Sequence, residues 1–165
     1  MRFSVRRATA GDATALADIY VRARLECMPY LPRIHSREDV LSWIRETMPR
    51  HDEVWVAEDE ARVVGFFALS GDLLFHLYVY PELHGQGAGS LLSERVTELS
   101  PDGFRLWVFQ RNTQAREFYE HRGMRVVELT DGSGNEEREP DALYEWVPGR
   151  SRAEDRETVS PGPGG

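Results

Sequence analysis

The chain has 165 residues, 41% of them hydrophobic, which fits one domain with a real core. Its formal net charge of −8 argues against a protein that binds nucleic acid through a broad basic surface. The single cysteine, Cys27, excludes an internal disulfide framework and a zinc site built on a cysteine pair. The N-terminus has no apolar signal segment, and no apolar run approaches the ~18 residues that span a bilayer. We therefore expect a cytoplasmic protein with no membrane or nucleic-acid partner.

The first part of the chain predicts one strand followed by two helices. Residues 3–6 alternate between apolar and polar side chains, as a half-buried strand does. Apolar residues at helical spacing then predict a helix over residues 13–25. Two prolines follow it, and neither can continue a helix. Ser36 precedes acidic residues and is therefore the expected N-cap of the second helix.

The middle of the chain predicts three consecutive strands, at residues 54–57, 63–69 and 73–79. Short polar turns separate them, so we expect an antiparallel meander. The last of the three is apolar at nearly every position, which predicts a central strand that is covered on both faces. Pro81 ends it, because proline cannot donate a hydrogen bond to a ladder.

The remaining residues alternate between helices and strands. In order, we expect a helix at residues 87–100, a strand at 104–109, a helix that Asn112 caps and that runs to about His121, and strands at 124–129 and 142–147. The strand–helix–strand step from residue 73 to 109 predicts a right-handed parallel crossover. Residues 1–148 are thus expected to form one α/β domain, with a mixed, mostly antiparallel seven-stranded sheet and about four flanking helices. Residues 149–165 are almost without apolar side chains and predict a disordered tail.

A glycine-rich segment, His84-Gly85-Gln86-Gly87-Ala88-Gly89-Ser90, lies directly between a predicted strand and a predicted helix. Glycine lets a ligand approach the backbone, and the free amide groups of a helix N-terminus attract anions. The segment therefore predicts a diphosphate site that needs no basic side chain. A flexible turn is the simplest alternative. A dinucleotide fold fits poorly because the spacing is not Gly-x-Gly-x-x-Gly, and a P-loop is excluded because Gly-Lys-Ser/Thr is absent from the sequence.

Two segments carry a resemblance to a known family. Residues 77–92 resemble the acetyl-CoA signature of the GNAT superfamily of N-acyltransferases, which has an apolar strand, Val-x-Pro and then Arg/Gln-x-x-Gly-x-Gly/Ala. His84 stands at the first signature position, where the family has Arg or Gln. Residues 106–124 resemble the family's later block, with a strand, an Asn, an Ala three residues on, Phe-Tyr and then Gly. The resemblance covers about residues 3–147, and it implies that the central fourth and fifth strands are parallel and splayed apart at one end.

The resemblance also implies where the cosubstrate acetyl-CoA would bind. It would lie between the splayed strands, with the pantetheine amides paired to the backbone of residues 77–79 and the diphosphate on residues 85–90. A backbone N–H near Val79 would polarise the thioester carbonyl. No metal is implied. The residues expected to contact acetyl-CoA are Leu77, Tyr78, Val79, His84, Gly85, Gln86, Gly87, Ala88, Gly89, Ser90, Asn112, Ala115, Phe118 and Tyr119.

The implied reaction is the aminolysis of a thioester, so the amine must lose a proton and the leaving thiolate must gain one. The resemblance assigns the acid to Tyr119, which shares a helix face with the small Ala115. A packed aromatic residue is the alternative. His76 is the candidate base because its pKa suits neutral proton transfer, although we favour a hydrogen-bonded core histidine there. Arg111 and Arg116 could meet CoA phosphates, but solvated surface positions are expected for both.

The resemblance implies an N-acetyltransferase that moves an acetyl group from acetyl-CoA to a primary amine of a small molecule or peptide, by direct attack in a ternary complex. A GNAT-fold protein that senses acyl-CoA without turnover is the alternative. An acidic surface mildly favours a cationic acceptor. Residues 27–33 and 132–137 are expected to shape the acceptor site. A homodimer is one expected assembly, because dimers are common in this family.

Overall fold

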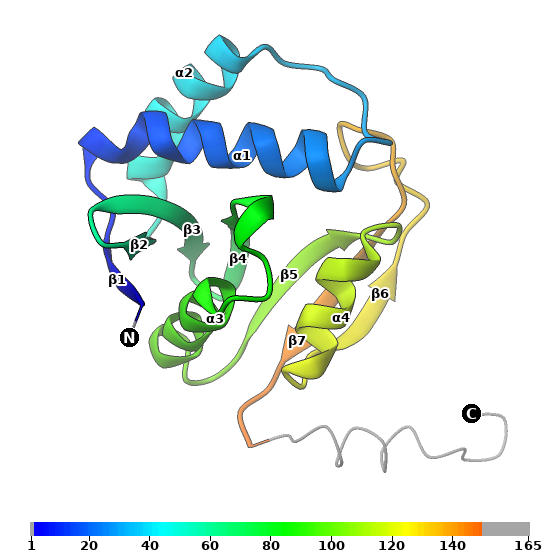
Figure 1. Cartoon of the computed structure of the whole chain (residues 1–165). Helices are drawn as coiled ribbons and strands as arrows, with labels where there is room; N and C mark the ends of the chain where they lie inside the picture. The colour runs from blue at the N-terminus through cyan, green and yellow to red at the C-terminus, as the bar shows by residue number, and fades with distance from the viewer. Residues whose placement is uncertain (1, 150–165) are drawn as a thin grey trace, which may run out of the picture. The chain divides into compact units, whose positions relative to one another are not determined.

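The computed structural model describes residues 2–149, which form two compact units. One unit ends at Ser100 and the other begins at Pro101, and we call them the N-terminal unit and the C-terminal unit. Among the described residues, the first has four strands and three α-helices, and the second has three strands and one α-helix. Figure 1 labels these elements. The predicted tail lies, from residue 150 onward, outside the described residues. Among residues 2–149, no helix has both the length and the apolar character that a membrane crossing requires.

The N-terminal unit is an antiparallel sheet with helices packed on it. Its elements are β1 (Phe3–Arg7), η1 (Ala10–Asp12), α1 (Ala13–Cys27), α2 (Arg37–Thr47), η2 (Met48–Arg50), β2 (Glu53–Asp59), β3 (Arg62–Ser70), β4 (Leu73–Val79), η3 (Pro81–Leu83) and α3 (Ala88–Leu99), where η marks a 3-10 turn. The strands follow the order β1-β2-β3-β4, and every neighbouring pair is antiparallel, which confirms the predicted meander. Both α1 and α3 contact β3 and β4.

A side-chain cap fixes where α2 begins, and a buried carboxylate precedes α1. The Ser36 hydroxyl accepts a hydrogen bond from the Asp39 N–H at 3.1 Å, and the Asp39 carboxylate accepts one from the Ser36 N–H, so the predicted N-cap is confirmed. Ahead of α1, the Asp12 carboxylate accepts two hydrogen bonds from Arg6, both at 2.9 Å, and one from the Thr9 N–H at 2.7 Å. The hydrogen bonds from Arg6 hold the pKa of Asp12 below its ordinary value.

The strand that is covered along its length is β3, not β4. Residues 64–69 of β3 are all buried, whereas Leu74 and Val79 are the buried positions of β4, and Phe75 is 49% exposed. The prediction that β4 is covered on both faces was therefore wrong. An apolar composition favours burial of a strand, but burial also depends on the neighbouring elements. On β4, the Phe75 ring lies 4.9 Å from the His51 ring and remains largely exposed, whereas residues 64–69 of β3 are covered on both faces.

Gly65 allows β3, β4 and α3 to approach one another closely. A Cβ at this position would lie 2.8 Å from the Tyr78 carbonyl oxygen and 3.2 Å from Cδ1 of Leu92 on α3. The neighbouring Phe66 ring lies 5.8 Å from the Tyr78 ring, which in turn lies 5.4 Å from the Tyr20 ring on α1. Because successive side chains of a strand point to opposite faces, α3 and α1 cover opposite faces of the sheet.

Replacing Gly65 by alanine is expected to lower the free energy of unfolding by about 1–3 kcal/mol, because the new Cβ would meet backbone as well as side chain. Urea denaturation followed by circular dichroism measures this change. Gly11→Ala is the matched control, since a Cβ there meets only the Thr9 hydroxyl, at an ordinary 3.7 Å. Equal stability of the two variants would contradict the close approach at Gly65.

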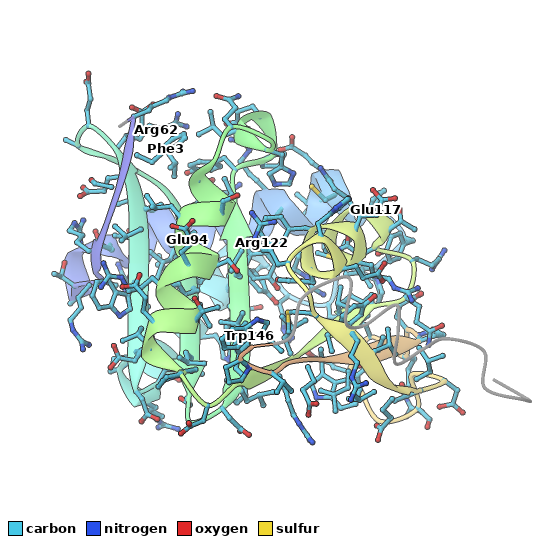
Figure 2. All side chains as sticks on the ribbon, turned by 90° about the horizontal axis from the view of Figure 1, so that it is seen from below. Phe3, Arg62, Glu94, Glu117, Arg122 and Trp146 are labelled. Atoms are coloured by element: carbon cyan, nitrogen blue, oxygen red, sulfur yellow. The ribbon has the colours of Figure 1, made fainter. Side chains whose placement is uncertain are left out.

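The C-terminal unit is a smaller antiparallel sheet with one helix. Its elements are β5 (Phe104–Phe109), α4 (Thr113–His121), β6 (Arg125–Leu129) and β7 (Asp141–Trp146). The strands follow the order β5-β7-β6, and both neighbouring pairs are antiparallel. Tyr144 at the centre of β7 is fully buried and lies opposite Leu106 of β5. Trp146, labelled in Figure 2, ends β7 with its ring 5.7 Å from that of Phe104.

Candidate functional site

The glycine-rich loop connects the end of β4 to the start of α3. Gly85 and Gly87 have φ values of 80° and 106°, in the left-handed region that glycine enters without strain. Gly87 is the N-cap of α3 and provides no side-chain hydrogen bond to the helix. A Cβ at either glycine would meet nothing within 4 Å. The first turn of α3 thus presents backbone N–H groups beside open space, which is the environment that favours an anion.

The backbone of β4 directs some of its polar groups away from β3. The Tyr80 N–H donates to the Val64 carbonyl at 3.0 Å, which fixes the phase of the ladder. Hydrogen-bonded positions alternate along an antiparallel pair, so the backbone groups of Tyr78 face β3, and those of Leu77 and Val79 point away from it. Of the three residues expected to pair with pantetheine, Leu77 and Val79 therefore have their backbone groups oriented outward.

Two side chains of the loop bond to the chain itself. The His84 Nε2–H donates to the Val79 carbonyl oxygen at 3.0 Å. The Gln86 side-chain amide donates to the Glu82 carbonyl at 3.1 Å, and the Arg2 guanidinium donates to the Gln86 side-chain oxygen. These bonds hold the first part of the loop, residues 84–86. What the loop offers to a ligand is therefore mainly its backbone.

His76 lies in a cluster of aromatic rings on the sheet face that α1 covers. Its ring centroid is 5.9 Å from that of Tyr20, 5.3 Å from that of Trp43 and 5.8 Å from that of Tyr78. The His76 Nδ1 is buried and has no hydrogen-bond partner among residues 2–149. Burial is the main reason that the pKa of His76 falls to about 3. His76 is thus a core histidine, but not one that is hydrogen-bonded at Nδ1, and near neutral pH it is a weak base.

Acid is expected to destabilise the protein partly through His76. Its folded pKa of about 3 lies below the ordinary 6.5, so between these values the unfolded chain binds the proton more readily. The contribution of neutral His76 to the free energy of unfolding is therefore complete above pH 6.5 and is lost as the pH falls towards 3. His76→Phe should flatten this pH dependence by up to about 1.4 kcal/mol per pH unit. Urea titrations at several pH values measure it, and equal slopes in both proteins would contradict a buried neutral imidazole.

Helix α4 carries the candidate acid, Tyr119, in the C-terminal unit. Tyr119 is 8% exposed, and its ring lies 5.3 Å from that of Phe118 and 6.4 Å from that of Tyr144. Among the described residues, the Tyr119 hydroxyl makes no hydrogen bond. Burial raises the pKa of the phenol well above its ordinary value of about 10, and the charge of Arg122 offsets only part of this. The phenol therefore stays protonated at neutral pH, as a proton donor must.

Asn112 begins α4 as the sequence predicts. Its side-chain oxygen accepts a hydrogen bond from the Ala115 N–H at 3.2 Å, which confirms the N-cap. Gly123 follows the helix with a φ of 84°, as expected for a glycine beyond the last turn. Phe118 is half-buried and has the Arg122 guanidinium over its ring at 3.7 Å. Figure 2 labels Arg122 beside the helix.

The sequence did not reveal a polar network of α4. The Arg116 Nε–H donates to the Tyr144 hydroxyl at 2.9 Å, and this hydroxyl donates to the Glu120 carboxylate. Arg116 is therefore held within the unit and is not the solvated residue that we expected. Arg111 is exposed, as expected, but it donates two hydrogen bonds to Glu139, at 2.7 and 2.8 Å. Both arginines meet partners 28 residues away, which no local pattern indicates.

The predicted site residues are divided between the two units. In the N-terminal unit, residues 77–79 end β4, and residues 84–90 follow after the short turn η3. His76 belongs to the same strand but points to the face of the aromatic cluster. In the C-terminal unit, α4 and its cap bring together Asn112, Ala115, Phe118 and Tyr119.

The chain is similar to known proteins in sequence and in structure. Residues 50–125 match the model of an acetyltransferase (GNAT) domain. The peptidyl-lysine N-acetyltransferase YjaB of Salmonella typhimurium is 30% identical over 128 residues, which cover 77% of this chain and 86% of the relative. The solution structure of apo-form YjaB from Escherichia coli has a TM-score of 0.75 at 26% identity, covering 89% of this chain and 99% of that one. The structure of yncA from Salmonella typhimurium with its cofactor acetyl-CoA has a TM-score of 0.70 at 17% identity, over 89% and 94%.

These similarities agree with the two segments that carried the resemblance. The likeness to the YjaB structure confirms the predicted fold class, a GNAT-like α/β fold, and the described residues contain the predicted seven strands and four α-helices. The matched residues 50–125 include both the loop ahead of α3 and the whole of α4. The chain therefore belongs to the GNAT family of acetyl-CoA-dependent N-acetyltransferases.

Proposed function

We propose that this enzyme transfers the acetyl group of acetyl-CoA to the side-chain amine of lysine in a protein or peptide, by direct attack in a ternary complex. The lysine acceptor is supported by the relative that is 30% identical, which is named a peptidyl-lysine N-acetyltransferase. The formal net charge of −8 suits an acceptor that carries positive charge before it reacts.

The observation that carries the proposal is the open backbone of the glycine loop. Gly85 and Gly87 keep side chains away from the N–H groups at the start of α3. A diphosphate there would accept hydrogen bonds from these groups and would be favoured by the helix dipole. The outward backbone groups of Leu77 would pair with the pantetheine amides, and the Val79 N–H would polarise the thioester carbonyl.

In the proposed step, the amine nitrogen attacks the carbonyl carbon of acetyl-CoA. A C–N bond forms, the C–S bond breaks, and the thiolate takes the phenol proton of Tyr119. Tyr119 then regains a proton from water. The amine attacks in its neutral form, which is in equilibrium with the protonated form in bulk solvent, and the N–H proton that it loses on becoming an amide passes to the solvent. His76, with a pKa of about 3, is given no part in this step. The products are an acetylated amine and the free thiol of CoA.

The test is an assay with acetyl-CoA and a peptide that contains one lysine and a blocked N-terminus. We expect free thiol to appear together with acetyl-lysine, which mass spectrometry detects in the peptide. All 20 basic Lys+Arg residues of the chain are arginine, so the enzyme itself adds no acetyl-lysine signal. The matched control is the same peptide with arginine in place of lysine. Saturable binding of acetyl-CoA without thiol release on a broad panel of amines would support the acyl-CoA sensor instead.

A further inference from the structure

Five side chains meet where β4 passes into the glycine loop. Asp18 and Arg22 come from α1, Arg62 is the first residue of β3, and Tyr80 and Glu82 belong to the turn at η3. We call these five residues the Tyr80 cluster. Figure 2 labels Arg62 near Phe3 at the end of the sheet where the loop begins.

Tyr80 is the centre of the cluster and is 6% exposed. Its hydroxyl donates to the Asp18 carboxylate at 2.7 Å. The Arg22 and Arg62 guanidinium groups lie over its ring, at 5.0 and 4.9 Å from the centroid. Burial, followed by the hydrogen bond to Asp18, raises the pKa of Tyr80 to about 12, so the hydroxyl remains a donor at neutral pH. These contacts tie the end of β4 to α1 and to the start of β3.

Glu82 ties the turn itself to the same arginines. Its carboxylate accepts two hydrogen bonds from Arg22, at 3.0 and 2.7 Å, in a bidentate arrangement. Arg62 lies 3.8 Å from the same carboxylate. The hydrogen bonds from Arg22 hold the pKa of Glu82 below its ordinary value. The Glu82 carbonyl also accepts the hydrogen bond from Gln86, so the cluster is linked to the loop by one residue.

The loop needs such support from its flank. Gly85 and Gly87 have no side chains to pack, and a Cβ at either would meet nothing within 4 Å. The position of their backbone therefore depends on the residues that precede them and on α3, which follows. An anion-binding loop gains affinity when its N–H groups are held in place before the ligand arrives.

We infer that the Tyr80 cluster positions the glycine loop for the diphosphate of acetyl-CoA, with Glu82 as its main positioning residue. This inference rests on the proposed function, because it assumes that the loop is the diphosphate site. Glu82 engages both arginines, so in this arrangement they position the turn and are not ligands of the diphosphate. From the sequence alone, an acidic residue beside a diphosphate site is not expected to help binding, because its negative charge repels the ligand.

The test compares Glu82→Gln with Glu26→Gln by isothermal titration calorimetry. Glu26 also accepts a hydrogen bond from Arg22, at 2.9 Å, and its side chain is 48% exposed against 43% for Glu82. The two variants therefore change the charge equally and each remove one partner of Arg22. Three probes are titrated: acetyl-CoA, S-acetylpantetheine, which lacks the diphosphate, and adenosine 3′-phosphate 5′-diphosphate, which lacks the pantetheine. Thermal denaturation checks that both variants are folded.

We expect Glu82→Gln to weaken binding of the two diphosphate-containing probes about fivefold and to leave S-acetylpantetheine unchanged, whereas Glu26→Gln changes none of them. Unchanged binding of all three probes to Glu82→Gln would overturn the inference. Tighter binding would also overturn it, because it would mean that the freed arginines are ligands. Equal weakening of all three probes would indicate a general disturbance and not positioning. If the wild-type protein binds no acetyl-CoA at all, the proposed function itself fails.

Discussion

Tyr119→Phe is expected to lower kcat about a hundredfold while leaving the Kd for acetyl-CoA nearly unchanged. The substitution removes one oxygen and keeps the ring that packs on Phe118 and Tyr144. The phenol is buried and protonated, and its hydroxyl donates a hydrogen bond to no other described residue. Its loss should therefore fall on the step in which the thiolate leaves. Steady-state kinetics with a lysine peptide, together with calorimetry for acetyl-CoA, measure the two quantities.

Tyr144→Phe is the matched control for this change. It removes a phenol hydroxyl from the same unit, but that hydroxyl is already bonded to Arg116 and Glu120. We expect this variant to lose about 1 kcal/mol or more of unfolding free energy, with a much smaller effect on kcat. If Tyr119→Phe keeps the kcat of the wild-type enzyme, Tyr119 has no part in the mechanism.

Gly87→Val is expected to weaken acetyl-CoA binding about a hundredfold. At a φ of 106°, a β-branched residue is strongly disfavoured, so the backbone at the start of α3 must rearrange. The new side chain would also occupy the open space beside the N–H groups that we assign to the diphosphate. Calorimetric titration of acetyl-CoA gives the change in Kd directly.

Gly71→Val is the control for backbone strain. Gly71 also has a positive φ, of 59°, and a Cβ there meets nothing within 4 Å, but it lies in the turn between β3 and β4. Both variants should lose stability, and only Gly87→Val should lose affinity for acetyl-CoA. A wild-type Kd in Gly87→Val would remove the loop from the proposed diphosphate site.

Much of the fold could be predicted because local chemistry decides it. Ser36 and Asn112 have the side chains that cap helices, and both do so. The strand at residues 73–79 and the strand at 104–109 have the predicted ends, because proline, glycine and polar turns limit them. The glycine loop and the Phe-Tyr block were recognisable for the same reason, since each needs particular residues at a fixed spacing.

The parts that could not be predicted depend on contacts between residues far apart in the chain. The apolar sequence of β4 suggested a strand that is covered on both faces, but the strand that is buried without interruption is β3, at residues 64–69, and Phe75 of β4 is 49% exposed. Arg22 and Glu82 are 60 residues apart, so neither signals the other. His76 looked suited to proton transfer because its ordinary pKa was assumed. The rings around it, which come from α1, α2 and β4, remove water and lower that pKa.

Because residues 64–69 of β3 are all buried, their amides can serve as an internal reference in hydrogen-exchange experiments on the enzyme. Amides in the middle of a strand that is bonded on both sides exchange with deuterium mainly when the whole unit opens. Those of residues 64–69 should therefore be among the slowest of the N-terminal unit, and their rates should report its global opening. The exchange rates of the amides at the start of α3 can be compared with those of residues 64–69, with and without a ligand. A ligand that slows exchange only at the start of α3 protects the loop, whereas one that slows both sets raises the stability of the whole unit.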